Sequence, residues 1–121
     1  MRYLSLSLAT FLTLACSFAT AQSSNHEVTP EQYVTQEELA AIYVLSEICP
    51  SLTTHQQDFQ HGYQALLQEY LPNIANPSEA LHRLMSQPNS APILKEAQQD
   101  ADRAGEAKNA QICQELTTYR K

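Results

Sequence analysis

Three cysteines are spread along the 121-residue chain, and their placement constrains the fold more than any other feature. Cys16 lies in an uncharged N-terminal stretch that has the layout of a cleavable export signal. Removal of that stretch leaves Cys49 and Cys113. A pair of cysteines in a small exported chain is typical of one disulfide, because the compartment is oxidising and a small core gains from a cross-link. The bridge would close a 64-residue loop, which in the chain-entropy model stabilises the fold by roughly 4 kcal/mol. Neither cysteine belongs to a C-x-x-C pair, which favours a structural bridge over a metal or redox role.

The first 21 residues have the layout of an export signal. Arg2 supplies a positive start, an uncharged stretch follows, and Ala19-Thr20-Ala21 fits the small-x-small rule for cleavage. We expect a signal peptide over 1–21, cut between Ala21 and Gln22, and a short flexible leader over 22–28. The sequence therefore predicts a periplasmic or secreted protein whose mature chain has no membrane span.

Cys16 offers a second processing route. The run Leu14-Ala15-Cys16 resembles the end of a bacterial lipobox, in which the cysteine is lipidated and becomes the new N-terminus. Thr13 stands where that pattern prefers Leu, so cleavage after Ala21 is favoured. Lipidation at Cys16 would make the product an outer-membrane lipoprotein, which also lies outside the cytoplasm.

Acidic residues outnumber basic ones in the chain that follows the signal. All 13 Asp and Glu lie there with six of the seven Lys and Arg, which gives a net charge of −7. Nucleic acids and anionic lipids need clustered basic side chains, so we expect neither as a partner. The same charge would favour a basic protein as partner. Two glycines are too few for a glycine-rich phosphate loop.

Helical periodicity and helix caps predict a single all-α domain over 29–121. The main helix opens at the capping box of Thr35, with Thr29 as an earlier candidate. It is expected to end at Cys49, because Pro50 disfavours helical geometry in the residue before it. No segment alternates apolar and polar residues long enough for a strand. We expect a bundle of four to five helices linked by one disulfide.

A second helix is expected to run to Leu71, and Thr53 or Thr54 can cap its start. Its aromatic and leucine residues repeat at helical spacing, which predicts one buried face. Gly62 lies inside this helix at a cost of about 1 kcal/mol relative to Ala, which suggests a close helix contact or a slight irregularity.

The remaining chain divides at its prolines. Asn76 and Pro77 favour the start of a short third helix, and a loop then leads to a last helical segment from Ala91 to Tyr119. The middle of that segment has mostly alanine on its apolar face, so it can pack closely but buries little. Gly105 is the point where it can divide into two helices.

Histidines and carboxylates do not form a convincing catalytic or metal site. His55 and His61 lie about 120° apart around a helix axis, which is poor geometry for sharing an ion with Asp58 between them. Glu79 and His82 match the E-x-x-H spacing of di-iron bundles, which need two such motifs. We therefore assign no catalytic, metal-binding or cofactor-binding residue, and we do not expect an enzyme.

Tyrosine is the main aromatic residue after the signal, and it is enriched at protein interfaces because it joins apolar area to a hydroxyl group. Tyr43 and Tyr63 are in register with apolar stripes, so we expect structural roles for them. Tyr33 and Tyr119 lie near element ends and are our candidates for a partner surface.

The segment Tyr43 to Leu52, YVLSEICPSL, resembles one found in a group of small, exported, functionally uncharacterised bacterial proteins. In those proteins, as here, a second cysteine lies near the C-terminus. The resemblance implies a location in the cell envelope and brings no catalytic residues with it.

Together these features favour a small exported helical protein that acts by binding another protein, as an inhibitor or accessory factor. One alternative is an acid- or stress-responsive periplasmic chaperone, because carboxylate and histidine protonation could loosen a thin core. Another is an outer-membrane lipoprotein with a structural role. The sequence does not name the partner.

Overall fold

The computed structural model describes residues 34–120, and this part of the chain contains α-helices, one short 3₁₀ helix and no strand. The predicted all-α bundle with one disulfide is thus confirmed. The signal peptide, the leader at 22–28, the Thr29 cap and Tyr33 lie outside the described residues. In chain order the elements are α1 (Gln36–Leu52), α2 (Gln56–Tyr70), α3 (Pro77–Met85), η1 (Pro88–Ser90), α4 (Ala91–Ala104) and α5 (Glu106–Thr118).

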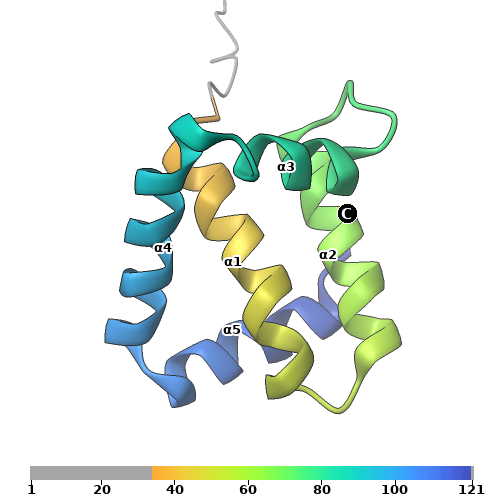
Figure 1. The fold of residues 1–121 in the computed structure, drawn as a ribbon. Coiled ribbons are helices and arrows are strands. Elements are labelled where there is room, and N and C mark those ends of the chain that lie inside the picture. The colour runs from red at the N-terminus through yellow and green to blue at the C-terminus, as the bar shows by residue number, and fades with distance from the viewer. Residues whose placement is uncertain (1–33, 121) are drawn as a thin grey trace, which may run out of the picture. The chain divides into compact units, whose positions relative to one another are not determined.

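Helix α1 lies at the centre of this domain, between α4 on one side and α2 on the other (Figure 1). Helix α3 crosses near one end of α1, and α5 crosses near the other. Leu39 and Ile42 share one apolar stripe of α1 and are buried, but Val44, which lies on another side of the helix, is buried as well. A helix with neighbours on opposite sides needs more than one apolar face, which explains why a single stripe underestimates its buried surface.

The capping box of Thr35 forms as predicted. The Glu38 backbone N–H donates to Thr35 Oγ1 at 3.1 Å, and the Thr35 backbone N–H donates to Glu38 Oε2 at 2.8 Å. The two bonds satisfy donors that a helix N-terminus otherwise leaves open.

The prediction that α1 ends at Cys49 is wrong, because the helix continues through Pro50 to Leu52. Cys49 is fully buried and bonded to Cys113, which holds its backbone in place. Only one further turn follows, and the Thr53 backbone N–H closes it by donating to the Cys49 carbonyl at 3.1 Å. The tertiary attachment of Cys49 thus overrides the local effect of proline.

The expected caps at Thr53 or Thr54 are also wrong, since His55 is the N-cap of α2. Thr53 Oγ1 accepts a hydrogen bond from the His55 backbone N–H, so this side chain shapes the turn before the helix. The side chain of Gln56 bridges the turn, because its Nε2 donates to the carbonyls of Pro50 and Thr53, each at 2.7 Å. A side chain at the start of α2 thereby supplies hydrogen bonds to carbonyls at the end of α1.

Helices α2 and α5 approach each other at Gly62, as the position of this glycine suggested. A methyl group built on Gly62 would lie 1.6 Å from the Leu116 carbonyl oxygen, so only glycine fits this contact. Phe59, Tyr63 and Leu67 are buried on the same helix. The disulfide between Cys49 and Cys113 joins α5 to α1, with the two Cα atoms 5.3 Å apart.

Gly105 divides the last segment into α4 and α5. Its φ of 86° and ψ of 163° belong to a backbone region that only glycine adopts without strain. Helix α4 has no fully buried residue, in agreement with its alanine-rich face. The predicted loop before it contains the short helix η1.

Candidate functional site

The two cysteines form a structural bridge inside the domain. Cys49 and Cys113 are both fully buried and bonded to each other, so neither sulfur is available as a nucleophile or metal ligand. No group of three or more His, Cys, Asp or Glu among residues 34–120 is arranged to hold a metal ion. His55 Nδ1 lies 4.0 Å from Asp58 Oδ2, both of them exposed, and His61 is an exposed neighbour on the same helix.

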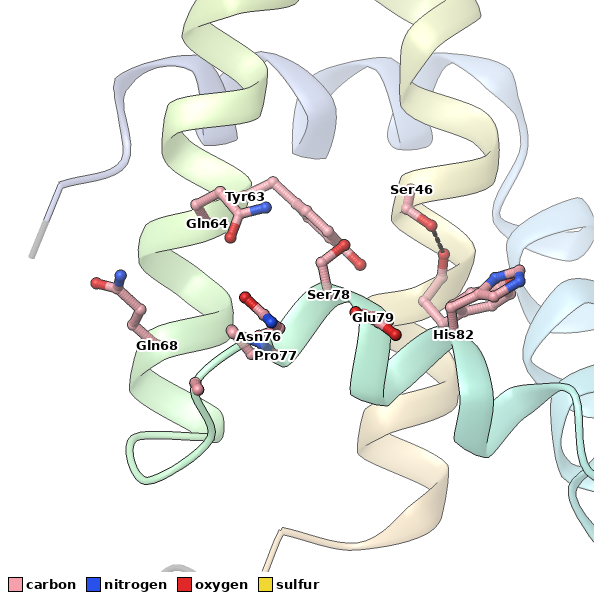
Figure 2. Close-up of a pocket in the computed structure, with 11 residues that line it drawn as sticks. Ser46, Tyr63, Gln64, Gln68, Asn76, Pro77, Ser78, Glu79 and His82 are labelled. Atoms are coloured by element: carbon pink, nitrogen blue, oxygen red, sulfur yellow. Dashed lines mark hydrogen bonds between the residues drawn. The ribbon is translucent and has the colours of Figure 1, made fainter.

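A first depression, which we call the polar cleft, has a volume of about 620 Å³ and lies between α1, α2 and the start of α3 (Figure 2). Hydroxyl, carboxamide, carboxylate and imidazole groups line it, and none of its lining residues is Lys or Arg. The polar groups come from Tyr43, Ser46, Tyr63, Gln64, Gln68, Asn76, Ser78, Glu79 and His82.

Two residues that the sequence places 39 positions apart meet at one end of the polar cleft. The Tyr43 hydroxyl lies 3.0 Å from His82 Nδ1, within hydrogen-bond distance, and the two ring centroids are 5.9 Å apart. Glu79, one turn before His82, pairs instead with Arg83 at 2.7 Å. In the E-x-x-H motif, the histidine therefore lies within hydrogen-bond distance of a tyrosine, whereas the glutamate forms an ion pair with an arginine.

Tyr63 forms the inner wall of the polar cleft. Its ring is buried, and its hydroxyl donates to the Ile42 carbonyl at 3.2 Å. Burial disfavours the charged phenolate and raises the pKa of Tyr63 to about 12. Tyr63 thus stays protonated and ties α2 to α1, which agrees with the structural role expected for it.

A second depression, the acidic groove, has a volume of about 370 Å³ and runs between α1 and α4 toward α5. Its floor is aliphatic, and three carboxylates border it: Glu37, Glu96 and Asp100. The floor consists of Ala41, Val44, Leu45, Ile48, Ile93, Ala97, Ala101, Ala104 and Ile112.

A shallower depression adjoins this one and shares Ile48, Ala101 and Asn109 with it, so we use the name acidic groove for the two parts together. The shallower part adds the carboxylates of Glu47, Asp102 and Glu106. No Lys or Arg lines either part. Among the described residues, only one of these six carboxylates, that of Asp100, forms an ion pair with a basic side chain, that of Arg103.

Tyr119 lies away from both depressions. It is half-buried, and its hydroxyl donates to the Glu69 carboxylate. That hydrogen bond holds the proton on the phenol and raises the pKa of Tyr119. Tyr33, Cys16, Ala21 and Gln22, the other candidates from the sequence, lie outside the described residues.

The carboxylates of the acidic groove are the main feature that sequence reasoning missed. A signal was present, because Glu96 and Asp100 are four residues apart and directly precede Ala97 and Ala101 of the alanine face. That spacing places two carboxylates along one edge of a small-residue stripe. The contribution of Glu37 and Glu47 from α1 depends on helix packing and has no local signature.

A family model described as a domain of unknown function, DUF7944, matches residues 35–116. The chain belongs to this family. The match starts at the N-cap of α1 and reaches Leu116 in α5. Both cysteines, the polar cleft and the acidic groove therefore lie within the DUF7944 domain.

Neither the curated proteins nor the solved structures provide a significant match to the chain. Within the part of the DUF7944 protein that the structure describes, no helix is both long enough and apolar enough to cross a bilayer.

Proposed function

We propose that this DUF7944 protein is an exported binding protein whose acidic groove receives a basic, amphipathic segment of another protein. The observation that carries the proposal is the lining of the groove, where six carboxylates surround an aliphatic floor that no Lys or Arg interrupts. An apolar side chain of the partner would fill the floor, and its Lys and Arg would meet the carboxylates.

The floor of the groove suits an inserted side chain. Helix α4 contributes Ala97, Ala101 and Ala104, which leave room that larger residues would fill. Leu45 and Ile48 on α1 are only half-buried, so a partner can cover apolar area that the domain leaves open. Anchors of this kind supply most of the affinity in small interfaces.

The rim charges would act mainly on association. Exposed carboxylates attract a basic partner over about one Debye length, roughly 8 Å at physiological salt, and raise the rate of encounter. The net charge of −7 after the signal extends this attraction beyond the groove itself. A second copy of the same acidic chain would be repelled, which favours a different protein as occupant.

The test uses a synthetic helical peptide of leucine and lysine, with leucine on one face, and compares matched pairs of variants. Ala41→Arg places a long cation at an exposed position of the groove, whereas Ala107→Arg places it at an exposed position on α5 outside the groove. We expect calorimetry to show binding that Ala41→Arg abolishes and Ala107→Arg preserves. Equal binding by the two variants would contradict the proposal.

A second pair separates specific contacts from overall charge. E47Q/E96Q removes two groove carboxylates, and E69Q/E115Q removes two carboxylates elsewhere, so both proteins change by the same net charge. Each exposed ion pair is worth about 0.2–1 kcal/mol, so the loss of two pairs in E47Q/E96Q should weaken binding roughly two- to thirtyfold more than its control. Equal losses would mean that only net charge attracts the peptide.

Export is a separate part of the proposal. The signal layout of residues 1–21 supports it, with cleavage after Ala21 favoured over lipidation at Cys16. The intact mass of the protein recovered from the envelope fraction distinguishes an N-terminus at Gln22 from an acylated N-terminus at Cys16. An uncleaved chain in the cytoplasm would refute export and leave the groove experiments unaffected.

A further inference from the structure

The polar cleft is chemically distinct from the acidic groove, since amide and hydroxyl groups dominate its lining. Gln64 extends from α2, while Asn76 and Ser78 lie at the start of α3 and face it across the cleft (Figure 2). All three residues are exposed, and Asn76 makes no capping hydrogen bond to α3. Carboxamides and hydroxyls can each donate and accept, so these groups are open to a ligand of the same character.

Charge in the polar cleft argues for an uncharged ligand. Its one carboxylate, Glu79, is paired with Arg83, and its lining has no Lys or Arg to bind an anion. An ionic ligand would therefore lose solvation without gaining a counter-charge. A purely apolar ligand is equally unsuited, because it would cover amide and hydroxyl groups without satisfying them.

One end of the cleft supplies apolar surface. The half-buried Tyr43 ring lies next to the His82 ring, with 40° between the two planes. The hydrogen bond between Tyr43 and His82 keeps the two rings together. A ring with C–H groups on its face and hydroxyls at its edge could rest against this corner while its hydroxyls reach Gln64, Asn76 and Ser78.

From these features we propose that the polar cleft binds an uncharged saccharide. Its volume of about 620 Å³ falls within the range of small-molecule sites, roughly 300–1,000 Å³. An extended peptide is less suited, because peptides bound through their backbone usually add to an exposed strand edge, and residues 34–120 contain no strand. The site is separate from the acidic groove and does not depend on the function proposed for it.

The experiment titrates the full mature protein with two neutral probes, tri-N-acetylchitotriose and maltotriose, and with a neutral tripeptide blocked at both ends. Side-chain amide signals of Gln64 and Asn76 report binding by NMR. We expect saturable shifts of these signals with at least one saccharide at millimolar concentrations. The absence of shifts with both saccharides overturns the proposal, and so does a shift by the peptide alone.

Variants locate the binding. Q64A/S78A removes two exposed polar groups from the cleft and raises intrinsic helix propensity at both positions, so the protein should keep its circular dichroism spectrum. We expect this variant to weaken saccharide binding about tenfold. Gln99→Ala, an exposed change on α4 outside the cleft, and Ala41→Arg in the acidic groove should leave it unchanged. Equal affinity for Q64A/S78A and the wild type would contradict the assignment.

Discussion

Gly62→Ala is the substitution that most directly tests the packing of α2 on α5. In an exposed helix this change is stabilising by about 1 kcal/mol, because alanine is the better helix former. In this protein the added methyl carbon would lie 1.6 Å from the Leu116 carbonyl oxygen, 2.7 Å from its carbonyl carbon and 3.5 Å from its Cα. The obstacle is backbone, which cannot rotate away as a side chain would, so the two helices must separate.

The expected loss of stability follows from the distance by which the two helices must separate. Ordinary van der Waals contact begins at 3.4 Å, so the backbones of α2 and α5 must move apart by about 2 Å at this point. Overpacking of this kind costs about 3 kcal/mol, at the upper end of the usual range, and the helix propensity of alanine offsets about 1 kcal/mol of it. We expect a net loss of about 2 kcal/mol, which for a domain of this size lowers the Tm by roughly 8–16 °C.

The assay is urea and thermal unfolding of the oxidised protein, followed by far-UV circular dichroism. His61→Ala, an exposed change at the neighbouring position, is the control and should alter the unfolding free energy by less than about 0.5 kcal/mol. A Gly62→Ala protein as stable as the wild type, or more stable, would refute the close contact between α2 and α5.

Three further predictions concern the disulfide, a buried tyrosine and the second glycine. Removing the bridge with C49S/C113S should lower the unfolding free energy by roughly 4 kcal/mol, measured by denaturant titration, and the wild-type bridge should resist reductant until the protein unfolds because both cysteines are fully buried. The pKa of Tyr63 rises from 10.0 to about 12 on folding, so its contribution to stability is complete below pH 10 and is lost as the pH rises toward 12; alkaline unfolding of Tyr63→Phe should lack that loss. Gly105→Ala should cost roughly 1–3 kcal/mol in thermal unfolding through backbone strain alone, since no residue beyond the adjoining chain lies within 4 Å of the added carbon, and an unchanged Tm would show that α4 and α5 join differently.

Besides the disulfide and the close contact at Gly62, the predictions that succeeded concern groups within one turn of each other. The Thr35 capping box needs only residues three apart, and Pro77 at the start of α3 needs only its own fixed φ. The failures lie where distant contacts compete with local preference. Helix α1 passes Pro50 because Cys49 is held by α5, and the N-cap of α2 is His55 because Gln56 bonds back to the end of α1.

The candidate sites were harder to predict from the sequence than the helices. The polar cleft brings Tyr43 to His82 and has Gln64 and Asn76 in one lining, and in each case the two residues come from separate parts of the fold. The acidic groove likewise draws its carboxylates from α1, α4 and α5. Only the part of each site that lies on a single helix had a spacing that the sequence could reveal.

By itself, the sequence determined the helical content, the capping box at Thr35, the start of α3 at Pro77, and the single pair of cysteines available for a bridge. These features depend on backbone preferences and on interactions between residues a few positions apart. The tertiary structure alone decided that α1 lies between α4 and α2, that Gly62 meets the Leu116 carbonyl, and that carboxylates from three helices border the two parts of the acidic groove. Such contacts join residues tens of positions apart, and many helix arrangements share the same local pattern, so only the packing of the whole domain selects among them.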